Sequence, residues 1–397
     1  MNLCEASLYV HVPFCAGGKC DYCDFYSLPL MSGSHTGSRV ERYIDSVLSE
    51  GNELFETYKP ENVPTLYIGG GTPSVLGAAG IRRLLGGLLG VISRYSPEPA
   101  EITVEANPES ADEAFLAAAR EAGANRLSLG IQTFFSQSRQ AVHRDRPRRE
   151  MTPDACETML RRSLSLTAGY FPGSFSADLI AGLPFQNKST LLNDISALLE
   201  YKPAHVSLYA LTVEPETPLA KMATAGKIIL PDRDKADELW LLGRDTLEER
   251  GYNQYEVSNF CLPGREALHN IRYWQMRNWL ALGPSASATI IDDDEGMGIR
   301  FTKNAAGPSL KPDSIEELDR LILIKETILM GFRYIKGPDE ALFARRFRCA
   351  LSDLLPKTIR AWRERGLFFS DRLALTKEGL LLLDQFLLDA FLELDIS

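Results

Sequence analysis

The chain has 397 residues, of which 45% are hydrophobic and 24% are charged, and its formal net charge is −10. These values are typical of a globular protein with one large domain and room for a smaller one. The acidic balance argues against nucleic acid as the main partner, because phosphate contacts need a basic surface. No stretch approaches 18 consecutive apolar residues, and the first seven residues do not resemble a secretory signal. The sequence therefore predicts no membrane span and a cytoplasmic location, where thiols stay reduced.

As far as Leu211, the chain alternates between short β-rich runs and longer helical patterns. The predicted strands are Ser7–Val12, Pro64–Ile68, Glu101–Ala106, Asn125–Ile131, Phe175–Ala181 and His205–Leu211. The predicted helices between them are Arg39–Tyr58, Ile81–Ser93, Ala111–Ala122, Pro153–Leu166 and Lys188–Glu200. This alternation predicts an α/β fold whose parallel sheet curls into a partial or full TIM-like (β/α)6 barrel.

The periodicity weakens after this barrel. Residues 212–303 contain polar and aromatic stretches, and we assign them to an extension of the barrel domain, which thus spans residues 1–303. Residues 304–314, NAAGPSLKPDS, are rich in Gly, Pro and Ser, which predicts a linker. From Ile315 on, Leu, Ile and Phe recur at helical spacing. Residues 315–397 are therefore predicted to form a small helical domain, with a winged-helix-like form and a hairpin at 368–375 as one interpretation.

Three of the seven cysteines lie close together in HVPFCAGGKCDYCDF, with the spacing C-x4-C-x2-C. A structural zinc site needs four ligands and would have to recruit Cys4 or His11. A reactive dithiol would leave one of the three cysteines unexplained. A [4Fe–4S] cluster held by three thiolates would leave one iron open for a substrate or cofactor. The spacing favours the cluster over zinc, and the other cysteines are interpreted as small core residues.

Three further unusual stretches follow predicted strands. They are GGGTPS (69–74), EANPES (105–110) and GIQTF (130–134). In β/α barrels the active site is built from the loops at the carboxyl ends of the strands. We therefore expect these stretches and the cysteines to meet at one site.

Together with LYVHVPFC, CDYCDF, NRLSLGIQTF, DLIAGLP, HVSLYALTVEPETPL, YEVSNF and HNIRYW, these motifs carry a family resemblance. The chain resembles the radical S-adenosylmethionine (SAM) family of oxygen-independent coproporphyrinogen III oxidases, and within it the HemW-type haem chaperones, over essentially its whole length. The resemblance implies a partial radical SAM barrel in which Cys15, Cys20 and Cys23 bind a [4Fe–4S] cluster. The open iron would chelate SAM, which is cleaved to a 5′-deoxyadenosyl radical when the cluster is reduced.

The resemblance also implies SAM contacts at positions that match the family's motifs. These are Tyr9, Tyr22, Gly70, Gly71, Thr72, Glu105, Gln132, Arg144, Asp178 and Ala210. The alternative for the glycines is an ordinary tight turn, and for the glutamate a solvated loop acid. HNIRYW implies that His269 binds haem, since neutral imidazole is a good iron ligand. A hydrogen-bonded loop histidine is the alternative, and His11 is a weaker candidate ligand.

The sequence departs from the family at two informative positions. Cys15 and Cys20 are separated by four residues where the family has three, and Phe25 stands where the oxidase branch carries a further cysteine. The second difference favours a haem chaperone that binds haem and delivers it to haem proteins. The alternative is an oxidoreductase that converts coproporphyrinogen III to protoporphyrinogen IX. The implied partners are haem or another tetrapyrrole, haem-accepting proteins and an electron donor for the cluster.

Overall fold

The computed structural model describes residues 3–30, 36–144, 152–303 and 314–396. Its central feature is a 12-stranded sheet with the order β14-β13-β12-β11-β1-β4-β5-β6-β7-β8-β10-β9. Neighbouring strands from β11 to β8 are parallel. The two edge strands are not paired with each other in the part of the chain described, so the sheet is an open, partial barrel.

Six strands form the predicted (β/α)6 unit. They are β1 (Ser7–Val12), β4 (Thr65–Gly70), β5 (Glu101–Ala106), β6 (Arg126–Gln132), β7 (Phe175–Ala181) and β8 (His205–Ala210). Most of their residues are buried, because helices cover the outer face of the sheet and the site and its extension cover the inner face. The predicted partial barrel is thus confirmed, with strand boundaries within two residues of those expected.

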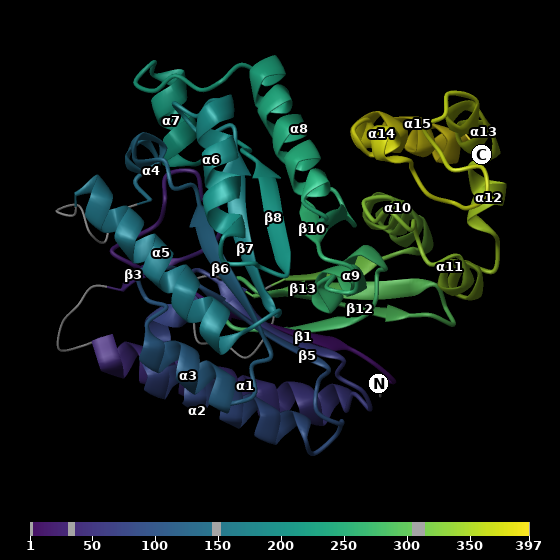
Figure 1. Ribbon diagram of the computed structural model, residues 1–397. Helices are drawn as coiled ribbons and strands as arrows, with labels where there is room; N and C mark the ends of the chain where they lie inside the picture. The colour runs from purple at the N-terminus through teal and green to yellow at the C-terminus, as the bar shows by residue number, and fades with distance from the viewer. Residues whose placement is uncertain (1–2, 31–35, 145–151, 304–313, 397) are drawn as a thin grey trace.

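The helices that connect these strands cover the outer face of the sheet (Figure 1). They are α1 (Thr36–Tyr58), the 3-10 turn η1 (Pro73–Leu76), α2 (Gly77–Ile92), α3 (Glu113–Glu121), α4 (Ser136–Ala141), α5 (Pro153–Tyr170) and α6 (Lys188–Leu199). Local sequence signals fix several of their starts. Asp112 caps α3 by accepting from the Phe115 N–H, and Asn187 forms a capping box with Thr190 at α6.

The region after β8 is more ordered than its weak periodicity predicts. It contains α7 (Pro218–Thr224), α8 (Arg233–Glu249), α9 (Leu268–Trp274) and the strands β9 (Asn253–Gln254), β10 (Asn259–Cys261), β11 (Trp279–Leu282), β12 (Ser287–Asp292) and β13 (Met297–Thr302). Strand β11 pairs in parallel with β1 on the side away from β4. The extension thus continues the sheet on the side of β1 that faces away from β4.

The C-terminal region packs around a core of its own, beside β12 and β13 (Figure 1). Its helices are α10 (Arg320–Gly331), α11 (Glu340–Phe347), α12 (Leu351–Leu354), α13 (Pro356–Glu364), α14 (Lys377–Leu380) and α15 (Leu383–Ile396). The expectation of helix from Ile315 on is wrong at its start, because β14 (Ser314–Leu318) joins the edge of the large sheet by pairing with β13. The hairpin predicted at 368–375 is a single bridge between Phe368 and Leu375. Most of the predicted linker, 304–313, lies outside the described residues, and the division into domains remains a proposal.

One helical stretch, Pro73–Ile92, is long and apolar enough to cross a bilayer by length and composition alone. Its apolar residues belong to the core of the barrel, where α2 packs against α1 and α3. That packing is typical of a core helix in a globular domain, so no membrane protein is indicated.

Candidate functional site

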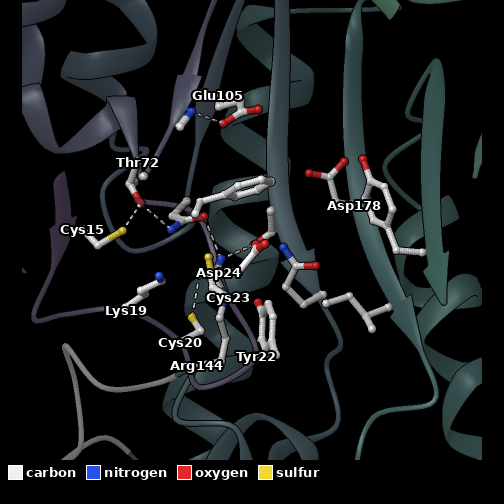
Figure 2. Close-up of a pocket in the computed structure, with 18 of the residues that line it drawn as sticks. Cys15, Lys19, Cys20, Tyr22, Cys23, Asp24, Thr72, Glu105, Arg144 and Asp178 are labelled. Carbon is white, nitrogen blue, oxygen red and sulfur yellow. Dashed lines mark hydrogen bonds between the residues drawn. The ribbon is translucent and has the colours of Figure 1, made fainter. Parts of the chain in front are cut away.

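A cavity of about 410 Å³ opens at the carboxyl ends of the barrel strands. Every predicted cluster and SAM residue except Tyr9 lines it: Cys15, Cys20, Tyr22, Cys23, Gly70, Gly71, Thr72, Glu105, Gln132, Arg144, Asp178 and Ala210. We call it the first cavity. Figure 2 shows the three cysteines on one side of it and Asp178 on the opposite side, with Glu105 above.

The cysteine loop leaves the barrel at the end of β1. Strand β2 (Phe14–Ala16) pairs with β3 (Leu28–Leu30) and closes the base of the loop. Gly17 and Gly18 have φ values of 67° and 116°, which favour glycine, and the Cys23 N–H donates to the Cys20 carbonyl at 3.2 Å. These turns hold all three thiols half-buried on one wall, as a cluster bound by three thiolates requires.

Within the described ranges, no three His, Cys, Asp or Glu side chains converge closely enough to hold a metal ion. A four-iron cluster makes a different demand, because each of its cysteines binds a different iron. Burial raises the pKa of Cys15, and it raises the pKa of Cys23 to about 11. Metal binding favours thiolates, so loading the site would release protons.

Arg144 joins the cysteine loop to two strand ends. Its guanidinium donates to Cys20 Sγ at 3.7 Å, to Asn107 Oδ1 at 2.7 Å and to the Gly130 carbonyl at 2.6 Å. Its Nε is buried and has no partner among the described atoms. A buried donor without a partner is costly, so this N–H marks a position for an acceptor that the described residues do not supply.

The predicted glycine loop packs directly against the strand that leads to Cys15. A Cβ on Gly71 would lie 2.5 Å from the Phe14 carbonyl oxygen. A Cβ on Gly70, whose φ is 110°, would meet the His11 ring. The next residue, Thr72, donates to Cys15 Sγ at 3.6 Å. The loop is therefore more than an ordinary tight turn, because any side chain there would push the cysteine strand away.

Two carboxylates face the first cavity, one from β5 and one from β7. Glu105 accepts from the Tyr67 hydroxyl at 2.6 Å and from the Gly70 N–H at 3.2 Å, and burial raises its pKa to about 7. Asp178 accepts from the Ser128 hydroxyl at 3.4 Å, and burial raises its pKa to about 6. A cationic or hydroxyl-bearing ligand would stabilise the charged forms of both groups.

Gln132 stands at an irregularity of the sheet. The pairing of β6 with β7 shifts register between Gly130 and Gln132, and Gln132 has a φ of 68°. A Cβ on Gly130 would lie 3.0 Å from Gln132 Nε2 and 3.2 Å from Arg144 Nη2. The amide and the guanidinium thus converge above one glycine. A non-glycine residue at positive φ that lines a cavity is typical of a functional position.

Sequence reasoning missed Asn107, which holds this corner together. Its amide donates to Thr72 Oγ1 at 2.9 Å, and its oxygen accepts from Arg144. It also missed the hydrogen bond between His143 Nδ1 and the buried Asp21 carboxyl group, which anchors the middle of the cysteine loop. The motif EANPES contains Asn107, but the sequence assigned a role only to Glu105 within it. His143 had no signal, because its partner is distant in sequence.

A second cavity, of about 520 Å³, adjoins the first and shares Asp24, Phe25, Gly70 and Glu105 with it. Its other lining residues are Tyr9, His11, Tyr26, Tyr67, His269, Asn270, Tyr273 and Ser285. Tyr67 stacks on Tyr9 with ring centroids 6.2 Å apart and on His269 with centroids 4.9 Å apart. Tyr9 and His269, the two predicted residues absent from the first cavity, thus lie together here.

Both ring nitrogens of His269 have partners. Nδ1 lies 2.7 Å from Thr65 Oγ1, and Nε2 lies 3.2 Å from the Tyr273 hydroxyl. Burial lowers the pKa of His269 to about 3, so the imidazole is neutral at physiological pH. His11 also uses both nitrogens, toward Tyr9 and the Tyr26 carbonyl. Either histidine would have to exchange a hydrogen bond to bind iron.

Comparison with known proteins agrees with this geometry. Residues 9–214 match the radical SAM superfamily. The chain is 33% identical to the haem chaperone HemW of Lactococcus lactis, over 96% of this chain and 97% of that protein. It is 33% identical to the mitochondrial radical S-adenosyl methionine domain-containing protein 1 of Mus musculus, over 83% of this chain and 73% of that protein.

Among solved structures, the chain resembles the coproporphyrinogen III oxidase HemN of Escherichia coli. The TM-score is 0.77 at 20% identity, over 98% of this chain and 90% of that one. At this identity the likeness shows the fold alone.

Proposed function

Because this chain belongs to the radical SAM superfamily and, within it, to the family of the HemW haem chaperones, we propose that it binds haem and delivers it to haem proteins. The observation that carries the proposal is the pair of adjoining cavities. One gathers the cysteines and the polar residues, and the other is lined by aromatic rings. The location would be cytoplasmic, and the partners would be haem-accepting proteins and an electron donor.

Membership of the superfamily implies a [4Fe–4S] cluster and SAM. We assign the cluster to Cys15, Cys20 and Cys23, whose thiols share one cavity wall. A bound cluster would supply the electron for reductive SAM cleavage. Gly17 and Gly18, both at positive φ, would let the loop take up the extra residue between Cys15 and Cys20.

The polar groups of the first cavity suit a zwitterionic ligand such as SAM. Glu105 offers carboxylate oxygens to an ammonium group, and the free Nε–H of Arg144 offers a donor to a carboxylate. Gln132 and Asp178 supply an amide and a second carboxylate for hydroxyl groups. The Arg144 Nε–H would gain the acceptor that it lacks among the described atoms, and the buried carboxylates would gain a counter-charge or a donor.

We assign the haem to the second cavity, with His269 as the candidate iron ligand. Its neutral imidazole is the ligating form, and the 3.2 Å contact of Nε2 with Tyr273 is the longer of its two hydrogen bonds. The His269→Ala change should shift the haem absorption bands, whereas Tyr273→Phe, which frees Nε2, should keep them.

Oxidation of coproporphyrinogen III remains a second candidate function. It is favoured by the direct contact between the two cavities, which would bring a tetrapyrrole close to SAM. Phe25, in place of the further cysteine of the oxidase branch, argues against it.

One experiment tests both functions on the same preparation. Anaerobically reconstituted protein with about four irons per chain is titrated with haem, and is separately incubated with SAM, reductant and coproporphyrinogen III. Saturable haem binding, followed by transfer to an apo-haem protein without porphyrinogen turnover, is expected. Protoporphyrinogen IX with matching 5′-deoxyadenosine would establish the oxidase. Absence of haem binding would overturn the chaperone.

A further inference from the structure

The second cavity combines aromatic walls with negative charge. Its ring wall consists of Tyr9, Tyr67 and His269, closed by Tyr273 at one end with its ring edge-on to His269. Its acidic residues are Asp24 and Glu105. No lysine or arginine belongs to its described lining, whereas Lys19 and Arg144 line the first cavity.

Phe25 stands at the boundary between the two cavities. It lines both, yet 63% of the residue remains exposed. A phenyl ring gains free energy when it leaves water, and it gains more when it stacks on another π-system. A large exposed aromatic ring at the mouth of a ring-lined cavity is therefore a contact surface for a flat apolar ligand.

We propose that Phe25 and the ring wall of the second cavity receive the face and the vinyl-bearing edge of a protoporphyrin-type tetrapyrrole, with its propionates left outside. The cavity thereby discriminates against tetrapyrroles that carry propionates on every ring, such as coproporphyrin. This inference rests on the proposed haem-binding function and adds an orientation, a specificity and a residue to it.

The charge of the cavity is the physical reason for this orientation. A propionate placed inside would lose water and meet Asp24 and Glu105, with no cation among the described lining residues. Burial already raises the pKa of Glu105 to about 7, consistent with a cost for placing negative charge against this wall. Vinyl and methyl groups carry no such penalty. The cavity volume of about 520 Å³ lies within the usual range for small-molecule sites.

A ligand series on the wild-type protein tests the orientation. The three probes are iron protoporphyrin IX, its dimethyl ester and iron coproporphyrin III, all of which keep the same metal. We expect the ester to bind within about threefold of haem, and iron coproporphyrin III to bind at least about tenfold more weakly. Equal affinity for iron coproporphyrin III, or a loss of about tenfold with the ester, would overturn the orientation.

A variant series tests Phe25. Phe25→Ala should weaken haem binding by about tenfold, and Phe25→Trp should retain it. Phe185 supplies the matched control, because 59% of it is exposed and it is not among the described residues that line either cavity. Phe185→Ala should leave haem affinity unchanged. Unchanged affinity in Phe25→Ala would overturn the role of Phe25.

These outcomes separate the inference from the function on which it rests. A wild-type chain that binds no tetrapyrrole overturns both. A chain that binds haem but shows no preference and no Phe25 effect overturns the inference alone. Because Phe25 lies two residues after Cys23, iron content is measured for each variant. The wild-type ligand series decides the orientation even if a Phe25 variant loses iron.

Discussion

The two cavities share lining residues, but different interactions hold their walls together. The first is held by polar contacts among a thiol, an amide and a guanidinium, and it leaves the Arg144 Nε without a partner. The second is held by ring stacking, and the nitrogens of its two histidines all have partners. Unsatisfied polar groups favour a charged cofactor, whereas a closed aromatic wall favours an apolar cargo. The comparison predicts that the two sites fail independently when they are altered.

The largest expected effect is loss of the cluster. Cys15→Ser should reduce iron in anaerobically reconstituted protein from about four per chain to below about one, because the two remaining thiolates are too few to retain a four-iron cluster. Haem affinity should stay within about threefold, since Cys15 does not line the second cavity. Iron analysis and a haem titration measure both quantities. Cys349→Ser is the control, because Cys349 packs against the C-terminal core. A Cys15→Ser chain that retains four irons would refute the ligand assignment.

Removal of the buried guanidinium should weaken SAM binding. Arg144→Met deletes charge-assisted hydrogen bonds and should lower SAM affinity by about a hundredfold. Equilibrium dialysis of SAM against the reconstituted protein checks the change, with haem affinity as the internal reference. Arg82→Met removes a guanidinium that pairs with Glu121 on the surface and should have no effect. Equal losses of SAM and haem binding would show that Arg144 supports the fold rather than the first cavity.

A side chain added to the glycine loop should displace the strand that leads to Cys15 and so disturb the first cavity. Gly71→Ala places a Cβ 2.5 Å from the Phe14 carbonyl, one residue before Cys15. The backbone must move, so the free energy of unfolding should fall by about 2–3 kcal/mol in urea titrations. Gly86→Ala is the matched control. Gly86 is exposed on α2 with no atom within 4 Å of its added Cβ, so the change should stabilise by up to about 1 kcal/mol. A tolerated Gly71→Ala would mean that the contact is not tight.

The smallest effect concerns the shared carboxylate. The folded pKa of Glu105 is raised from 4.5 to about 7, so across this window the folded chain keeps a proton that the unfolded chain has released. The free energy of unfolding should therefore fall as pH rises through the window. Glu105→Gln removes this term, so at pH 8 the ligand-free variant should be the more stable by about 1–3 kcal/mol, with little difference below pH 4.5.

Urea titrations of both chains between pH 4 and pH 8 measure this difference, and SAM binding provides the second measurement. The variant should bind SAM more weakly, because its amide cannot pair with an ammonium group as a carboxylate does. Stability curves that run parallel across the pH range would show that Glu105 does not carry the shift.

Local sequence was sufficient for the barrel. Strands β1, β5 and β7 begin and end at the predicted residues, because each is a short run rich in β-branched, aromatic or other apolar residues between longer helical patterns. The region after β8 was not predictable in the same way. Strand β11 is short, and its place beside β1 depends on pairing with a segment more than 260 residues earlier in the chain. No local pattern encodes such a pairing.

By itself the sequence determined the cysteine cluster, the motifs at the strand ends and hence the composition of the first cavity. Parallel strands bring their carboxyl ends to one edge, so residues at those ends must meet. Only the tertiary structure decided that Tyr9 and His269 belong to a second cavity, and that Phe25 lies between the two. That outcome depends on how α9 and the extension pack across the open side of the barrel. Such packing is set by long-range contacts rather than by periodicity.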